Sequence, residues 1–128
     1  MAPRLLMKAR VTESLTQARD IRSLRLVPVN RSSFPPHRPG SSTIVQLRSG
    51  ERRNYSLCGD PFDDDSWRIA VLKEVGGRGA SSEIHEKVEV GDVVWASHPQ
   101  PGIVIPYDAQ RLILIAGGIG VTPILSLM

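Results

Sequence analysis

The chain has 128 residues, of which 41% are hydrophobic, and it carries a formal net charge of +3. This length accommodates one domain with its own core but not two complete domains, so we expect one domain and part of another. Its eleven glycines and ten prolines favour many short elements joined by turns over long helices. The single cysteine excludes an internal disulfide and any four-cysteine zinc or iron–sulfur site within this chain.

Positive charge is concentrated in the first half of the sequence. Residues 1–53 contain eleven Lys or Arg against three acidic residues, whereas residues 54–128 contain five against ten. The arginines are separated from one another and no aromatic platform accompanies them, so we expect no nucleic-acid partner. Because the N-terminus shows no export signal and Cys58 is the only thiol, we expect a cytoplasmic location.

Alternating apolar and polar residues predict short strands through the first hundred residues. In the clearest segment Met7, Ala9 and Val11 share one face and Lys8 and Arg10 the other, the period of a half-buried strand. We expect six strands, at residues 6–12, 21–29, 43–47, 54–58, 67–73 and 93–96. A glycine-rich loop at residues 75–82 and one short helix at residues 82–88 precede the last strand. These elements predict a mainly β fold, a six-stranded antiparallel Greek-key barrel.

The sequence pattern changes after residue 109. Residues 112–116 form a continuous apolar run, which is typical of a strand covered on both faces. Residues 112–128 carry no charge, but their glycines and Pro123 argue against a membrane span. A glycine turn follows the run, and Pro123 suits the first turn of a helix that continues through residues 124–125. We therefore assign residues 1–109 to the barrel and residues 110–128 to the first strand and turn of an α/β nucleotide-binding domain.

Three segments could bind an anionic cofactor. In residues 53–57, Arg53 and Tyr55 can hold a phosphate and cover a flat ring, although an ordinary barrel strand with an exposed Arg and a core Tyr has the same pattern. Residues 77–81 offer consecutive backbone N–H groups ahead of a helix, which suits an anion but also an ordinary connection. At residues 112–125, Gly118-x-Gly120-x-x-Pro123 follows a buried strand and opens a helix, so a pyrophosphate could approach the backbone.

In this order the motifs R-x-Y-S-L, G-R-G-x-S and A-G-G-I-G-x-T-P resemble those of the ferredoxin-reductase superfamily. The resemblance covers residues 5–128 and is greatest to the phthalate dioxygenase reductase group, which includes vanillate demethylase reductase subunits. It implies that Arg53 pairs with a flavin phosphate, that Tyr55 packs on the ring and ribityl side, and that Ser56 hydrogen-bonds near N5. It also implies backbone contacts to the flavin from Val71 and Leu72, further phosphate contacts from Gly79, Ala80 and Ser81, and a pyridine nucleotide beside Gly117, Gly118, Gly120 and Thr122.

The same resemblance implies the cofactors and partners. FMN is favoured over FAD because the phosphate ligands are present while no loop or aromatic shelf for an adenine is evident. The flavin would take a hydride from NAD(P)H and pass single electrons to an iron–sulfur centre, outside this chain, of an aromatic-ring oxygenase or demethylase system. No side chain would act as a catalytic acid or base. The alternative is a truncated, catalytically inactive flavin-binding or interaction module.

Four further expectations concern single positions. Ala80 stands where the group usually has a second glycine, so its methyl group would lie where backbone approaches phosphate. Pro101 would reshape the loop between the two domains. His85 is expected to be a structural hydrogen-bonding residue and Cys58 a packed small residue. Residues 112–116, without neighbouring strands, would leave the C-terminus poorly anchored and prone to aggregation.

Overall fold

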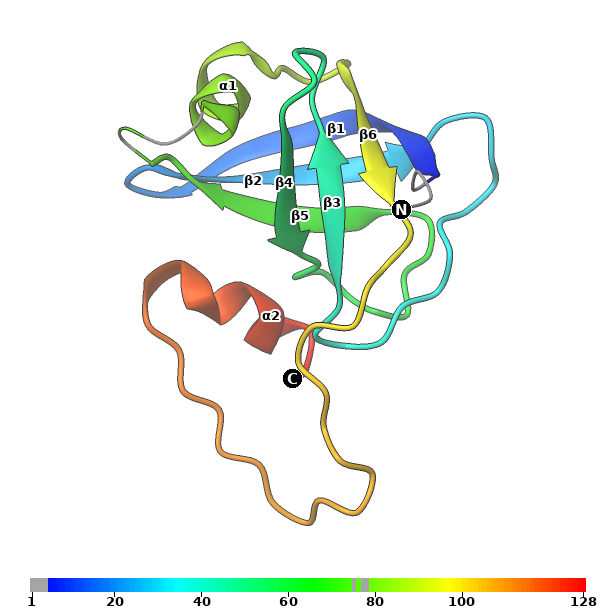
Figure 1. The fold of residues 1–128 in the computed structure, drawn as a ribbon, viewed down its shortest axis with the longest axis vertical. Coiled ribbons are helices and arrows are strands. Elements are labelled where there is room, and N and C mark those ends of the chain that lie inside the picture. The colour runs from blue at the N-terminus through cyan, green and yellow to red at the C-terminus, as the bar shows by residue number, and fades with distance from the viewer. Residues whose placement is uncertain (1–4, 75, 77–78) are drawn as a thin grey trace.

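The computed structural model describes residues 5–74, 76 and 79–128. Within this part of the chain, six strands form one antiparallel sheet in the order β4-β3-β6-β1-β2-β5. The strands are β1 (Leu6–Ala18), β2 (Ile21–Pro28), β3 (Ser42–Gln46), β4 (Arg52–Ser56), β5 (Trp67–Leu72) and β6 (Val93–Ser97). Figure 1 shows the sheet curling round on itself, with α1 (Ala80–Lys87) at one end and α2 (Val121–Leu125) at the other. The prediction of a mainly β, six-stranded antiparallel fold is confirmed.

The barrel closes between its two edge strands at one end only. The main-chain N–H of Cys58, just past β4, donates to the carbonyl of Arg68 in β5 at 2.9 Å. Over the described residues no ladder of paired residues joins the rest of β4 to β5. The two strands therefore bound a seam whose unpaired part runs beside residues 53–56 of β4 and residues 70–72 of β5.

The long strand β1 pairs with two neighbouring strands. Its first half pairs with β6, and from Ala9 onward it pairs with β2, with register shifts after Val11 and after Thr16. The expected strand at residues 6–12 was therefore too short. The additional residues are mostly exposed and polar, so no apolar alternation indicates a strand there. Their pairing with β2 holds them in the sheet.

The other element boundaries differ from the predicted ones by one or two residues. β4 begins at Arg52 rather than residue 54 because Arg52 and Gln46 already pair across the hairpin. Helix α1 begins at Ala80 instead of residue 82, directly after Gly79, whose φ of 99° only glycine adopts easily. The helix ends at Lys87, where Val88 turns into extended backbone.

A stacked aromatic pair fills one end of the barrel. The rings of Phe34 and Trp67 lie 4.1 Å apart between centroids at an interplanar angle of 16°. Phe34 reaches this position because its main-chain N–H donates to the carbonyl of Asp64 at 2.7 Å, which folds the proline-rich loop over the barrel. Trp67 is 2% exposed and Phe34 is 1% exposed, so the pair belongs to the main core.

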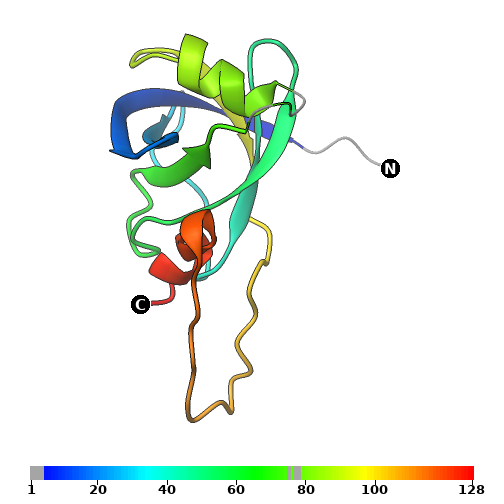
Figure 2. The ribbon, with the colours of Figure 1, turned by 90° about the vertical axis from the view of Figure 1, so that its left-hand side faces the viewer.

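The predicted strand at residues 112–116 is not formed. In Figure 2 this stretch is part of a long loop that runs away from the barrel. Leu112, Ile113, Leu114 and Ile115 are 48%, 81%, 41% and 86% exposed. A β-strand is stabilised by hydrogen bonds to a neighbouring strand, and the described residues provide none for this run. The prediction of a strand here is therefore wrong.

The C-terminal helix is anchored, contrary to the expectation for the C-terminus. A 3-10 turn, η1 (Gly118–Gly120), leads into α2, and Thr122 and Ser126 are buried. The hydroxyl of Ser126 accepts a hydrogen bond from the main-chain N–H of Gly40 at 2.7 Å. Gly40 has φ of 84°, and a Cβ there would lie 2.9 Å from the carbonyl oxygen of Ile103, so the close approach requires glycine. In the described part of the chain, no helix is long and apolar enough to cross a membrane.

Replacing Ser126 with alanine is expected to release this anchor. The substitution leaves the buried N–H of Gly40 without its acceptor, at a cost of about 1–3 kcal/mol. Amide hydrogen exchange read by NMR should show faster exchange at Gly40, with unchanged protection in β1 and β2. Unchanged exchange at Gly40 would show that the hydrogen bond does not hold α2 on the barrel.

Candidate functional site

A cavity of about 390 Å³ lies over the unpaired seam between β4 and β5. Three stretches far apart in the sequence meet there: strand β4, the end of β5 with the start of α1, and the turn from η1 into α2. The lining residues are Arg53, Asn54, Tyr55, Ser56, Ala70, Leu72, Glu74, Gly79, Ala80, Ser81, Ile119, Gly120, Thr122 and Pro123. The seam is thus the place where the chain brings its polar and glycine-rich segments together.

Strand β4 supplies a cation and an aromatic ring to the cavity. Arg53 and Tyr55 are two residues apart, so they lie on the same face of β4, where they pair with Val45 and Thr43 of β3. Tyr55 is half-buried against the core. Burial is the largest effect on its phenol and raises the pKa. The positive charge of Arg53 lowers this pKa, and the negative charge of Glu74 raises it. The net pKa lies above the ordinary value, so Tyr55 is protonated at neutral pH and can donate a hydrogen bond.

Arg53 is held by its own strand but retains free donor capacity. Its Nη1 donates to the carbonyl of Arg52 at 2.6 Å and lies 3.4 Å from a carboxylate oxygen of Glu51. Both side chains of this ion pair are more than 30% exposed, so the pair is weak. A guanidinium carries five N–H donors in a planar fork, and such a fork matches the geometry of a phosphate.

The start of α1 forms the second wall. The side-chain oxygen of Ser81 accepts a hydrogen bond from the main-chain N–H of Glu74 at 3.0 Å, which ties the exit of β5 to the first turn of the helix. No side chain from the described residues caps this end of α1. The methyl group of Ala80 belongs to the core and the residue is 2% exposed. Ala80 also lines the cavity, so the expected closeness of its methyl group to a phosphate stays a prediction.

The third wall comes from η1 and α2. Ile119, Gly120, Thr122 and Pro123 face the cavity. The hydroxyl of Thr122 donates to the carbonyl of Ile119 at 3.0 Å, so it satisfies the turn that begins α2. Because Ser126 fastens the end of α2 to the barrel, this wall keeps a defined position beside the seam.

The structure brings together nine of the twelve site residues predicted from the sequence. The other three are Val71, Gly117 and Gly118. Val71 is buried in the core, and its carbonyl lies 2.8 Å from Nε2 of His85, so that backbone group is already engaged. Gly117 and Gly118 lie in the turn before α2 and do not border the cavity.

Five lining residues were missed from the sequence: Asn54, Ala70, Glu74, Ile119 and Pro123. Asn54 and Ala70 lie on the two strands that border the seam, and no sequence pattern indicates which strands will be edges. Glu74 could have been found, because it is an acidic residue between a predicted strand and a predicted anion-binding loop. Ile119 and Pro123 belong to the glycine motif itself.

Two residues near the site have structural roles, as expected. Cys58 is half-buried, and its thiol lies 3.4 Å from the carbonyl of Arg68, the group that closes the barrel. Burial raises the pKa of this thiol, so it is protonated at neutral pH and poorly nucleophilic. His85 bonds the carbonyl of Val71 through Nε2, which joins α1 to β5.

The chain is similar in sequence to part of two known reductases. The chain is 38% identical over 110 residues to phthalate dioxygenase reductase of Burkholderia cepacia, a match that covers 86% of this chain and 34% of that protein. It is also 38% identical over 110 residues to vanillate O-demethylase oxidoreductase of Pseudomonas sp. strain HR199, covering 86% of this chain and 35% of that protein. No family model matches the chain.

A solved structure gives the same result for the fold. The solved structure of a phthalate dioxygenase reductase, a modular protein for electron transfer from pyridine nucleotides to [2Fe-2S], superposes with a TM-score of 0.91. The sequence identity is 34%, and the match covers 95% of this chain and 38% of that one. Barrel and cavity together thus define a ferredoxin-reductase-like domain. The chain belongs to the phthalate dioxygenase reductase group and spans about a third of the length of the curated relatives it matches.

Proposed function

We propose that the cavity over the β4–β5 seam binds FMN, and that the chain acts within a reductase that passes electrons from NAD(P)H through the flavin. The observation that carries the proposal is the convergence of Arg53, Tyr55 and the start of α1 in one cavity. Strand β4, which carries Arg53 and Tyr55, and the start of α1 are far apart in sequence, and each supplies groups of a type that a phosphorylated aromatic cofactor needs. The reductase and oxidoreductase relatives described above support the same reading.

The residues present fit a flavin phosphate and ring. Arg53 offers a fork of donors to the phosphate, and the uncapped first turn of α1 adds main-chain N–H groups and a favourable dipole. Ser81 can donate its hydroxyl hydrogen to the same anion while its oxygen accepts a hydrogen bond from the main-chain N–H of Glu74. Tyr55 supplies a flat half-buried surface for the ring, and Ser56 would bind at its N5 edge. A cavity of about 390 Å³ is within the usual size of cofactor sites.

A bound flavin would supply the redox chemistry, accepting a hydride and releasing electrons one at a time. The residues of this chain would bind and orient it. Gly120 and Thr122 line the same cavity from the opposite wall, which favours approach of a pyridine nucleotide on that side. We propose an iron–sulfur centre of an oxygenase or demethylase system as the electron acceptor. We also propose a cytoplasmic location, with which the free thiol of Cys58 is consistent.

A second candidate is a flavin-binding module that does not complete the electron transfer by itself. It is favoured by the exposed apolar run at residues 112–115, which no strand of the described residues covers. Under this candidate the chain binds flavin but does not reduce an acceptor dye from NADH.

The test is an absorbance titration of the purified chain with FMN and, separately, with FAD. Saturable binding with a shifted flavin spectrum is expected, with FMN the tighter ligand. Tighter binding of FAD would replace the FMN assignment, and the absence of binding to either would refute the flavin site. Addition of NADH and a dye to the FMN-loaded chain then separates the reductase from the binding module.

A further inference from the structure

One acidic side chain lies in the cavity that Arg53 makes cationic. Glu74 follows the end of β5 by two residues and lines the cavity, and its main-chain N–H is fixed by the hydroxyl of Ser81. Three ion pairs are present among the described residues, and none involves Glu74. Its neighbour Lys73 instead pairs with Glu86 at 3.1 Å. Glu74 is exposed at the edge of this cavity, and its carboxylate has no cationic partner in the described part of the chain.

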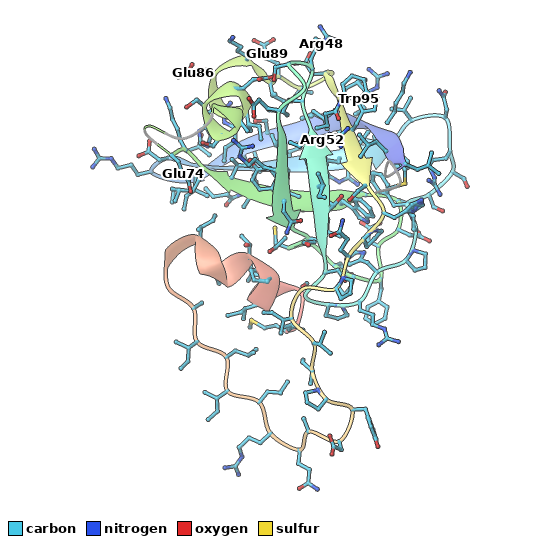
Figure 3. The ribbon with its side chains drawn as sticks, in the orientation of Figure 1. Arg48, Arg52, Glu74, Glu86, Glu89 and Trp95 are labelled. Carbon is cyan, nitrogen blue, oxygen red and sulfur yellow. The ribbon has the colours of Figure 1, made fainter. Side chains whose placement is uncertain are left out.

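The cation and the carboxylate line the same cavity as Tyr55. Arg53 lowers the pKa of the Tyr55 phenol and Glu74 raises it, so both charges act on the same hydroxyl group. Arg53 comes from β4, whereas Glu74 comes from the exit of β5, across the seam. Figure 3 shows Glu74 beside the end of β5, at a distance from Glu89 on the far side of α1.

This arrangement restricts which ligand group can lie against Glu74. A carboxylate accepts hydrogen bonds and repels an anion, so a phosphate at Arg53 cannot also contact Glu74. The group next to Glu74 must therefore carry donors but no negative charge. Aliphatic hydroxyls meet this requirement, and the proposed flavin carries a chain of them between its phosphate and its flat ring.

We propose that Glu74 recognises the polyol part of the ligand, its carboxylate accepting hydrogen bonds from the ribityl hydroxyls of the flavin. The proposal rests on the proposed flavin site and adds a specificity-determining residue to it. Glu74 would discriminate in favour of flavins that carry a ribityl chain and contribute nothing to the binding of the bare ring.

The experiment compares three ligands on the full chain: FMN, riboflavin, which lacks the phosphate, and lumiflavin, which lacks the ribityl chain. Affinities are measured by the change in flavin fluorescence for the unmodified chain and for Glu74→Ala. Hydrogen bonds to a charged group correspond to about a tenfold or greater change in affinity. Glu74→Ala is expected to weaken FMN and riboflavin by the same factor, about tenfold, and to leave lumiflavin unchanged.

Two further variants support the interpretation. Glu74→Gln keeps an oxygen acceptor without the charge, so a loss smaller than that of Glu74→Ala is expected. Glu89→Ala removes an exposed carboxylate that does not line the cavity, and all three affinities should remain unchanged. Circular dichroism of each variant verifies that the barrel is folded.

The outcomes separate this proposal from the flavin site itself. Tighter FMN binding by Glu74→Ala, with riboflavin unchanged, would show that Glu74 repels the phosphate and would overturn the proposal. Equal weakening of lumiflavin, or unchanged FMN and riboflavin binding, would overturn it as well while leaving the flavin site intact. If the unmodified chain binds none of the three ligands, the proposed function fails, and this proposal with it.

Discussion

Replacing Arg53 with alanine is expected to weaken FMN binding by about ten- to a hundredfold. The guanidinium lines the cavity on β4, and charge-assisted hydrogen bonds to a phosphate contribute about 1.5–3 kcal/mol. Riboflavin has no phosphate, so its affinity should remain within about twofold of the original value. Fluorescence titration of both ligands measures the two effects on the same protein.

The neighbouring arginine is a matched control. Arg52 is exposed, lies outside the cavity, and its Nε donates to the side-chain oxygen of Gln46 at 2.6 Å. Arg52→Ala removes the same charge one residue away, from a side chain that does not line the cavity. Equal losses from the two substitutions would indicate a general effect of net charge and would argue against a phosphate contact at Arg53.

Replacing Trp67 with alanine is expected to lower the free energy of unfolding by about 3–5 kcal/mol. Trp67 is 2% exposed and stacks on Phe34, so the substitution removes the largest buried side chain and leaves a cavity at the end of the barrel. For a domain of this size such a loss is a large part of the total stability. Urea unfolding followed by circular dichroism measures it.

Replacing Trp67 with phenylalanine distinguishes the contribution of the aromatic ring to stability from that of the indole N–H. The indole N–H of Trp67 is buried and lacks a hydrogen-bond partner among the described residues. Trp67→Phe keeps an aromatic ring against Phe34 and removes this unsatisfied donor, which offsets part of the lost burial. We expect it to cost less than half as much as Trp67→Ala. Equal costs would mean that stacking does not contribute at this position.

The barrel could be predicted because apolar and polar residues alternate within its individual strands. Met7, Ala9 and Val11 alternate with polar residues, and all three are buried in the structure. Prediction failed where strand formation depends on pairing with another strand. The second half of β1 has no apolar alternation and is held by β2, whereas residues 112–116 have a strong apolar signal but no strand to pair with among the described residues.

The candidate site was predicted in part for the same reason. Arg53, Tyr55 and Ser81 belong to local motifs from which anion binding was predicted, and the structure brings them to one cavity. Glu74 and Asn54 became lining residues only because β4 and β5 are the two edges of the sheet. That arrangement follows from the pairing order of six strands, which no single segment of the sequence specifies.

The incomplete closure of the barrel has a consequence for its thermodynamics. Beyond the hydrogen bond between Cys58 and Arg68, β4 and β5 are not joined by a ladder, and the cavity lies over this gap. A ligand that contacts both edges would act as the missing cross-connection. Because it would bind only the folded barrel, a ligand at a hundredfold excess over its Kd would add about 2.7 kcal/mol to stability. The supply of cofactor in the cell would then set the fraction of chains that remain folded, and thus their lifetime against proteolysis.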